Sequence, residues 1–249
     1  MAKLVQKSGY IKSGKASGYM RYIATREGVE KLAGNSAVTK GQRELIQKLL
    51  HDFPDAVELF EYEDYCRTPT LGTASAFISM ALDANLHEID PESGYMQYIA
   101  TRPRVQKRGT HGLFSSATAV DLASAISELE AHEGNVWTII YSLRREDAAR
   151  LEYDNADAWR TLLMENAPTL AKSMKISLEN FHWYAAFHDE GHHPHIHMMV
   201  WSDDPKEGFL TKDGIAAMRS KLTNAIFRDE MQQIYARKDV AYSDLVEAA

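Results

Sequence analysis

The residues of this chain best suited to chemistry are histidines gathered between Phe181 and Ser202. Six of the ten histidines lie in that stretch, and three of them follow the spacing His188, His195, His197. Neutral imidazole is the commonest metal ligand among side chains. Three imidazoles on one face leave coordination positions open for a substrate oxygen, which is typical of a catalytic metal site rather than a structural one.

The pattern of apolar residues predicts how these histidines are positioned. His195 and His197 alternate with apolar neighbours in residues 195–202, which predicts a buried strand with both imidazoles on one face. His188 ends a second apolar run, residues 181–188, and the Gly and Pro between the runs are typical of a hairpin loop. Across that hairpin His188 can reach the face that carries the other two.

The remaining polar residues of the hairpin are predicted to support the three ligands. His192 and His193 could each replace one of them, but Pro194 restricts their freedom. We therefore expect both at the rim, near a phosphate or behind the metal ligands. Asp189 and Glu190 are candidate general bases, although loop acids beside histidines more often orient the ligands. His182 is expected to be structural.

An internal repeat carries a second set of reactive residues. Residues 17–31 (SGYMRYIATREGVEK) and 93–107 (SGYMQYIATRPRVQK) are identical at eleven of fifteen positions. The duplication is either purely structural, or it provides two helices bearing Tyr and Arg that face one ligand. A phenol can attack phosphorus to form a covalent phosphotyrosine, so Tyr22 and Tyr98 are candidate nucleophiles.

The distribution of charge favours a nucleic-acid partner, although the net charge of −7 does not. Residues 1–31 sum to +5 and residues 93–112 to +4, so the remainder sums to −16. Binding depends on the local field, and two solvated basic segments without a partner are the alternative. The candidate DNA contacts are the basic residues in and beside the repeat: Arg21, Arg26, Arg102, Arg104, Lys107 and Arg108.

Length and composition indicate an ordinary globular protein. The chain has 249 residues, of which 45% are hydrophobic and 25% charged, enough for one large domain or two small ones. We find no apolar run of the ~18–20 residues that a membrane span needs, and no signal peptide. A single cysteine excludes an internal disulfide. These features predict a cytoplasmic protein.

The predicted elements indicate an α+β fold with a mainly antiparallel sheet of three or four strands flanked by helices. We expect one domain over residues 1–249, with a helical insertion and the repeat at about 39–131. A basic, glycine-bearing loop at 106–114 is suited to phosphates. Strands are predicted at 3–12, 135–143 and in the two arms of the hairpin, and helices at 39–53, 55–64, 72–87, 121–131, 154–174, with a possible break at Pro168, and about 212–238.

The motif HDEGHHPHIH at residues 188–197 resembles the three-histidine motif of conjugative relaxases in the HUH endonuclease superfamily. The flanking stretches are most similar to the MobP3/MobL family, among them GYMRYIATREGVEKL and FHWYAAFHDEG. The resemblance runs from about Val5 to Lys238. It implies a relaxase-like fold with the motif on a central hairpin.

The resemblance also implies an activity. Such enzymes nick one DNA strand at an origin of transfer, and a tyrosine attacks the scissile phosphate to give a 5′-phosphotyrosine. The three histidines would hold a divalent metal, Mn or Mg in function, with Zn, Ni or Co as alternatives. Tyr22 is favoured as the nucleophile because it follows the first strand in a Tyr-Ile-Ala-Thr-Arg-Glu-Gly context. Tyr98 is the rival, and Tyr19 and Tyr95 are less favoured alternatives. Glu190 stands where relaxases often have Asp.

The implied partners are single-stranded DNA at the origin of transfer, a coupling protein and accessory transfer proteins. Because we recognise no helicase or primase segment, we expect a nickase domain alone. Three other functions remain open at this stage. They are a replication initiator or transposase of the same superfamily, a metal hydrolase that activates water, and a DNA-binding module whose histidines hold a structural metal.

Overall fold

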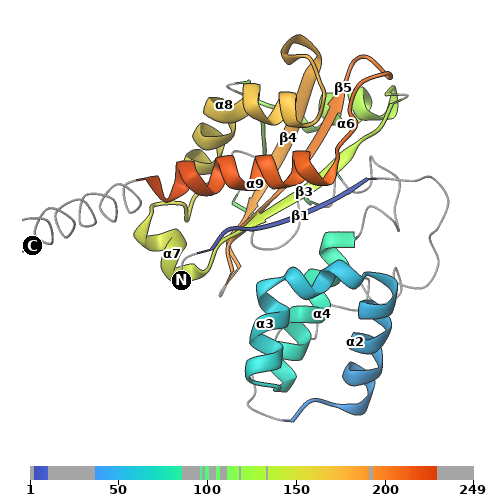
Figure 1. Ribbon diagram of the computed structural model, residues 1–249, viewed down its shortest axis with the longest axis vertical. Helices are drawn as coiled ribbons and strands as arrows, with labels where there is room; N and C mark the ends of the chain where they lie inside the picture. Colours follow the sequence, from blue (N-terminus) through green and yellow to red (C-terminus); the bar gives the residue numbers. More distant parts are fainter. Residues whose placement is uncertain are drawn as a thin grey trace, which may run out of the picture.

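An antiparallel sheet lies at the centre of the computed structural model, which describes residues 3–10, 37–85, 96, 99–100, 105–106, 111–117, 119–132, 134–190 and 193–228. Its strand order is β1-β3-β5-β4-β2 (Figure 1). This confirms the predicted α+β fold with an antiparallel sheet. The strands are β1 (Val5–Tyr10), β2 (Leu113–Phe114), β3 (Trp137–Ser142), β4 (Phe181–His188) and β5 (His195–Ser202).

The register between β4 and β5 places the three histidines on one face. His188 lies opposite His195, and Ala186 lies opposite His197. Directly opposed residues of an antiparallel pair point to the same side of the sheet. Every residue of β5 is buried, as expected for a central strand that is covered on both faces. The hairpin prediction is therefore confirmed.

The face opposite the histidines forms the main hydrophobic core. It is covered by α8 (Ala156–Ser173) and α9 (Lys212–Ile226), which lie next to each other across the sheet (Figure 1). Trp159 of α8 and Met218 of α9 pack in one cluster with Ile196 of β5. Alternate residues of β5 thus face this core, while the histidines between them face the other way.

The histidine face is also covered, at one end by α6 (Leu122–Glu130). Ile99 and Ala100 of the second repeat pack in the same cluster as α6. Met199 and Trp201 of β5 belong to that cluster as well. The second copy of the repeat therefore packs against the same sheet face as the histidines.

A separate group of helices accounts for much of the predicted insertion. It has its own core, to which Ile140 of β3 contributes, and Figure 1 shows it as a distinct body beside the sheet. Ile140 lies opposite His197, so this group packs against the histidine face too. Its elements are α2 (Lys40–Asp52), η2 (Pro54–Glu58), α3 (Phe60–Arg67) and α4 (Leu71–Asn85).

Some elements differ from the sequence predictions. The short helix α7 (Arg145–Arg150) was not predicted. The two-residue strand β2 was missed as well, because both elements are too short to show a periodicity. Asn155 caps α8, which continues through Pro168 where a break was expected. The last helix begins at Lys212 as predicted, but residues 229–238 lie outside the described residues.

Thr39 caps α2, and its removal provides a test of the insertion. The Gln42 backbone N–H donates to the Thr39 hydroxyl at 3.2 Å, and the Gln42 side chain accepts from the Thr39 backbone. We expect Thr39→Ala to lower the free energy of unfolding by about 1 kcal/mol, measured by urea denaturation. Thr39→Ser keeps the hydroxyl and should retain most of that stability. An equal loss in both variants would contradict the capping role.

Candidate metal centre

Three buried imidazoles converge on the histidine face. The ring centroids lie 4.6 Å apart for His188 and His197, 5.0 Å for His195 and His197, and 5.2 Å for His188 and His195. One ligand nitrogen of each ring lies within 4.8 Å of the other two. Each residue is at most 1% exposed. The site therefore lies within the fold, beneath the elements that cover this face.

The second copy of the repeat holds His188 from one side. The Nε2 atom of His188 lies 2.9 Å from the backbone oxygen of Ile99. A carbonyl oxygen can only accept, so Nε2 must donate, and Nδ1 is the nitrogen that can bind a metal. The Gln106 backbone N–H donates to the Phe187 oxygen at 2.9 Å, and Val105 forms a bridge with His188. Ile99, Val105 and Gln106 thus contact the ring of this histidine and the backbone beside it.

The hairpin loop and α3 hold His195 from the other side. The Nδ1 atom of His195 donates to the backbone oxygen of His193 at 3.0 Å, so Nε2 is the nitrogen that can bind a metal. The Nε2 atom of His193 lies 2.8 Å from a carboxylate oxygen of Asp64 on α3. A continuous set of contacts therefore links the inserted helices to a candidate ligand.

His193 is buried against α3, so it does not lie at an exposed rim; its carbonyl contact with His195 puts it behind a candidate ligand, the other predicted position. It is 4% exposed, and its ring stacks on Phe60 with centroids 5.1 Å apart. The Arg144 guanidinium lies 4.6 Å from the centre of the same Phe60 ring and binds Glu63 at 2.9 Å. The inserted helices cover this part of the loop, and no local pattern predicts that contact. His192 lies outside the described residues.

Two carboxyl groups of α3 have opposite pKa shifts. Burial alone would raise the pKa of Asp64, but His193 and Arg144 hold that pKa below its usual range. Burial raises the pKa of Glu61 to about 8, and the charges of Asp64, Glu190 and another nearby acid add to the shift. At neutral pH, Asp64 is therefore ionised beside His193, while Glu61 mostly carries a proton.

Glu190 contacts the histidine hairpin through its backbone. Its N–H donates to the backbone oxygen of His188 at 3.0 Å. Its carbonyl oxygen accepts a hydrogen bond from Arg145, which also binds Asp189 at 2.6 Å. These contacts fix the turn after β4. A role of the Glu190 carboxylate in orienting a ligand or taking up a proton stays a prediction.

The structure describes the predicted phosphate loop only in part. A Cβ on Gly112 would lie 2.1 Å from a methyl carbon of Val105 and 3.1 Å from the Gln106 backbone oxygen. Glycine at 112 therefore permits close packing beside the segment that holds His188. Leu113, the next residue, pairs with Ala186 of β4. Residues 107–110, which carry the basic charge of the loop, lie outside the described residues.

The predicted nucleophiles and DNA contacts lie outside the described residues, and their roles stay predictions. These residues are Tyr22, Tyr98, Arg21, Arg26, Arg102, Arg104, Lys107 and Arg108.

Two further polar residues lie on the histidine face and were not predicted from the sequence. Ser142 lies directly opposite His195 and is 1% exposed. Lys7 lies opposite Ile140 and forms an ion pair with Asp55 at 3.3 Å. The alternation of residues along β1 and β3 determines which side chains share a face. It predicts that Ser142 and Lys7 share the histidine face only once the pairing of β1 with β3 and of β3 with β5 is known.

A family comparison places this chain among known proteins. A family model described as MobL relaxases matches residues 1–249, the whole chain. The chain belongs to the MobL relaxases. This membership supports a relaxase, a DNA-nicking enzyme of conjugation and plasmid mobilization, and implies binding of single-stranded DNA. Searches for similar curated proteins and for similar solved structures found no match.

The three histidines of this relaxase fit a divalent metal ion. The donor atoms would be Nδ1 of His188, Nε2 of His195 and a ring nitrogen of His197. Backbone carbonyls orient two of the three rings, which is the usual arrangement for metal-binding histidines. Three imidazoles leave coordination positions for oxygen ligands.

Within the part of the chain that is described, no helix is both long and apolar enough to cross a membrane.

The contact between Asp64 and His193 should tune metal binding. Asp64→Asn weakens the hold on His193, whose carbonyl orients His195, so we expect the affinity for Mn²⁺ to fall about 10- to 100-fold. Isothermal titration calorimetry on the metal-free protein measures this affinity. Asp147→Asn, which alters an ion pair with Arg150 on α7, is the matched control. Unchanged affinity in folded Asp64→Asn protein would contradict the proposed support.

The raised pKa of Glu61 should make the free energy of unfolding fall as the pH rises. Its pKa is raised from 4.5 to about 8 in the folded protein. Its stabilising contribution is therefore fully present below about pH 4.5 and is lost as the pH rises through about 8. Urea denaturation of metal-free protein from about pH 5 to about pH 9 should show a steeper decline for the wild type than for Glu61→Gln. Identical pH profiles would show that the Glu61 carboxyl group is not protonated in the folded protein.

Proposed function

We propose that this relaxase nicks one DNA strand at an origin of transfer by attack of a tyrosine from the repeat. In this proposal His188, His195 and His197 hold a divalent metal beside the scissile phosphate. The observation that carries the proposal is the convergence of three buried imidazoles on the face against which Ile99 of the tyrosine-bearing repeat packs. Family membership supports the nicking of DNA.

The proposed reaction is a transesterification. When bound, the metal would withdraw electron density from an oxygen of the scissile phosphate. The phenolic oxygen forms a bond to phosphorus while the bond from phosphorus to the 3′ oxygen breaks. The phenol loses its proton and the 3′ oxygen gains one, which leaves a 5′-phosphotyrosine and a free 3′-hydroxyl. Reversal of these steps reseals the strand.

The proposal names two candidate tyrosines. Tyr22 comes first because the resemblance to relaxases places the nucleophile after the first strand. Tyr98 is the second candidate, and one contact supports it. Tyr98 directly precedes Ile99, whose backbone oxygen binds the ring of His188. By contrast, β1 is separated from β5 by β3 in the sheet.

The remaining parts of the proposal concern the groups around the reaction. Mn or Mg is the proposed metal in function, with Zn, Ni or Co as alternatives. Glu190 and His193 would support the ligands, and the basic residues of the repeat region would contact DNA phosphates. The proposed partners are single-stranded DNA from the origin of transfer, a coupling protein and accessory transfer proteins. The proposed compartment is the cytoplasm.

Adduct trapping can identify the nucleophile. Single-stranded oligonucleotides tiled across the DNA that flanks the coding sequence would be incubated with the protein and Mn²⁺. We expect a covalent DNA–protein adduct whose linked peptide contains Tyr22 or Tyr98. The phenylalanine variant of the true nucleophile should lose adduct formation at least about 1,000-fold, because no other oxygen replaces the phenol. Tyr19→Phe and Tyr95→Phe, one in each copy of the repeat, are matched controls.

The same experiment tests the other mechanisms. His197→Ala, or removal of the metal with a chelator, should abolish nicking if the metal assists the reaction. Metal-dependent nicking without an adduct, and retained in both Tyr22→Phe and Tyr98→Phe, would contradict tyrosine attack and support hydrolysis by activated water. DNA binding without nicking in any metal would contradict the enzymatic proposal itself.

A further inference from the structure

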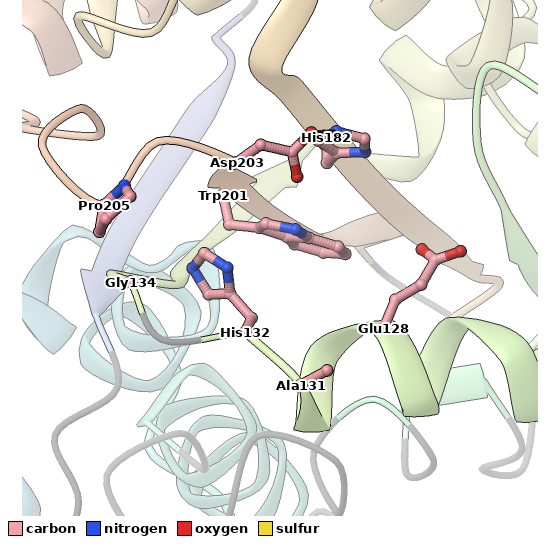
Figure 2. A pocket seen from close by; sticks show the side chains of 8 residues that line it. All are labelled: Glu128, Ala131, His132, Gly134, His182, Trp201, Asp203 and Pro205. Atoms are coloured by element: carbon pink, nitrogen blue, oxygen red, sulfur yellow. Dashed lines mark hydrogen bonds and ion pairs between the residues drawn. The ribbon is translucent and has the colours of Figure 1, made fainter.

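A second candidate site lies far from the histidine triad, on the same face of the sheet. It is a pocket of about 400 Å³ where the C-terminal end of α6 approaches β4 and β5 (Figure 2). His182 of β4 and Trp201 of β5, which are paired in the sheet, line it. His182 precedes His188 by six residues along β4, about 20 Å at the rise of a strand. The pocket is therefore separate from the metal centre.

The charges around this pocket favour a cation. Glu128 and Asp203 are among the lining residues, and no Lys or Arg is among those that the structure places there. Ala131 is the C-cap of α6, and the backbone carbonyls at a helix C-terminus carry a partial negative charge. A phosphate would be repelled by these groups. This pocket is thus unsuited to the DNA backbone that the metal centre is proposed to hold.

An aromatic wall limits the size of the ligand. The ring of Trp201 stacks on His182 with centroids 5.9 Å apart, and lies 5.6 Å from the ring of Tyr184. Figure 2 shows the indole between His182 and Asp203 on one side and His132 and Glu128 on the other. Trp201 is only 3% exposed, too little for a nucleobase to stack on its ring.

The polar groups of the pocket are held in place and can still accept hydrogen bonds. Asp203 bonds His182 through one oxygen at 2.7 Å, and Glu128 accepts from the Tyr184 hydroxyl through one oxygen at 2.8 Å. A carboxylate has two oxygens, so each acid keeps the capacity to bind a ligand. The Nε2 atom of His132 is buried without a hydrogen-bond partner among the described residues. Burial lowers the pKa of His132 and so favours its neutral form.

A divalent metal ion fits this pocket poorly. Among the described residues, the cluster of His, Cys, Asp and Glu whose ligand atoms converge is the histidine triad of the metal centre. The acids and imidazoles of the pocket are instead distributed around an open hollow. That arrangement suits a ligand with several N–H donors spread over a planar or tetrahedral head group.

We propose that this pocket binds an organic cation, a guanidinium or ammonium group. Glu128 and Asp203 would accept its hydrogen bonds, and Trp201 would form the aromatic wall. The same chemistry is offered by a basic side chain of a partner protein and by a free polyamine. The proposal does not depend on the metal centre or on the identity of the nucleophile.

A titration with matched charged and neutral probes tests this proposal. Nα-acetyl-arginine amide and putrescine would be titrated into the full chain, and the Trp indole N–H signals followed by NMR. The neutral analogue Nα-acetyl-citrulline amide keeps the shape of the arginine probe. We expect the arginine probe to shift the Trp201 signal, assigned with Trp201→Phe, and to bind at least about tenfold more tightly than the citrulline probe. Equal binding of the two would overturn the proposal.

Conservative variants locate the binding site. Glu128→Gln and Asp203→Asn should each weaken binding of the arginine probe about tenfold, because each removes one charge from the pocket. Glu179→Gln, at an exposed position in η4 (Leu178–Asn180), should leave the affinity unchanged. Retained affinity in the folded Glu128→Gln/Asp203→Asn double variant would contradict the proposed site. Tighter binding of an arginine-rich peptide would identify a partner protein as the source of the cation, and tighter binding of putrescine a polyamine.

Discussion

The pairing of β4 with β5 is the constraint on which the rest of this structure depends. Because side chains alternate along a strand, a shift of one residue in this pairing would turn His195 and His197 toward the opposite face. Ile196 lies between these two histidines and Met198 follows His197. Both apolar residues are buried in the core under α8 and α9. The apolar residues that stabilise the fold thus also determine the face on which the histidines converge, and a small change in core packing would reach the metal centre directly.

The elements around the triad hold two of the three imidazoles by their outer nitrogens and so determine which nitrogen can bind a metal. The backbone carbonyl of Ile99 does this for His188, and that of His193 does it for His195, while Asp64 binds the ring of His193. Ile99 and Asp64 both come from the part of the chain between β1 and β3, which a reading of the motif alone would treat as an insertion. This part of the chain therefore has a function within the site, because it orients groups whose reactivity depends on the tautomer.

Local features of the site could be predicted from the sequence, and contacts between distant segments could not. The spacing of His188, His195 and His197 predicted the convergence because a strand repeats every two residues and turn formers separate the two runs. The cap of α2 followed from Thr39 in the same local way. The burial of His193 depends instead on a contact with Asp64, 129 residues earlier in the chain. The near-identity of the two repeat copies also hides which of them approaches the histidines.

The position of β5 has a consequence for the order in which the protein can assemble. It lies between β3 and β4 at the centre of the sheet, yet it is the last of these strands in the chain. β1 pairs with β3, which follows more than a hundred residues later in the chain. Pairings between such distant segments form slowly. During synthesis, the triad therefore cannot form until residues 195–202 have left the ribosome. A growing chain would carry no complete metal site until then, so DNA cleavage that depends on this site could begin only after the sheet has closed.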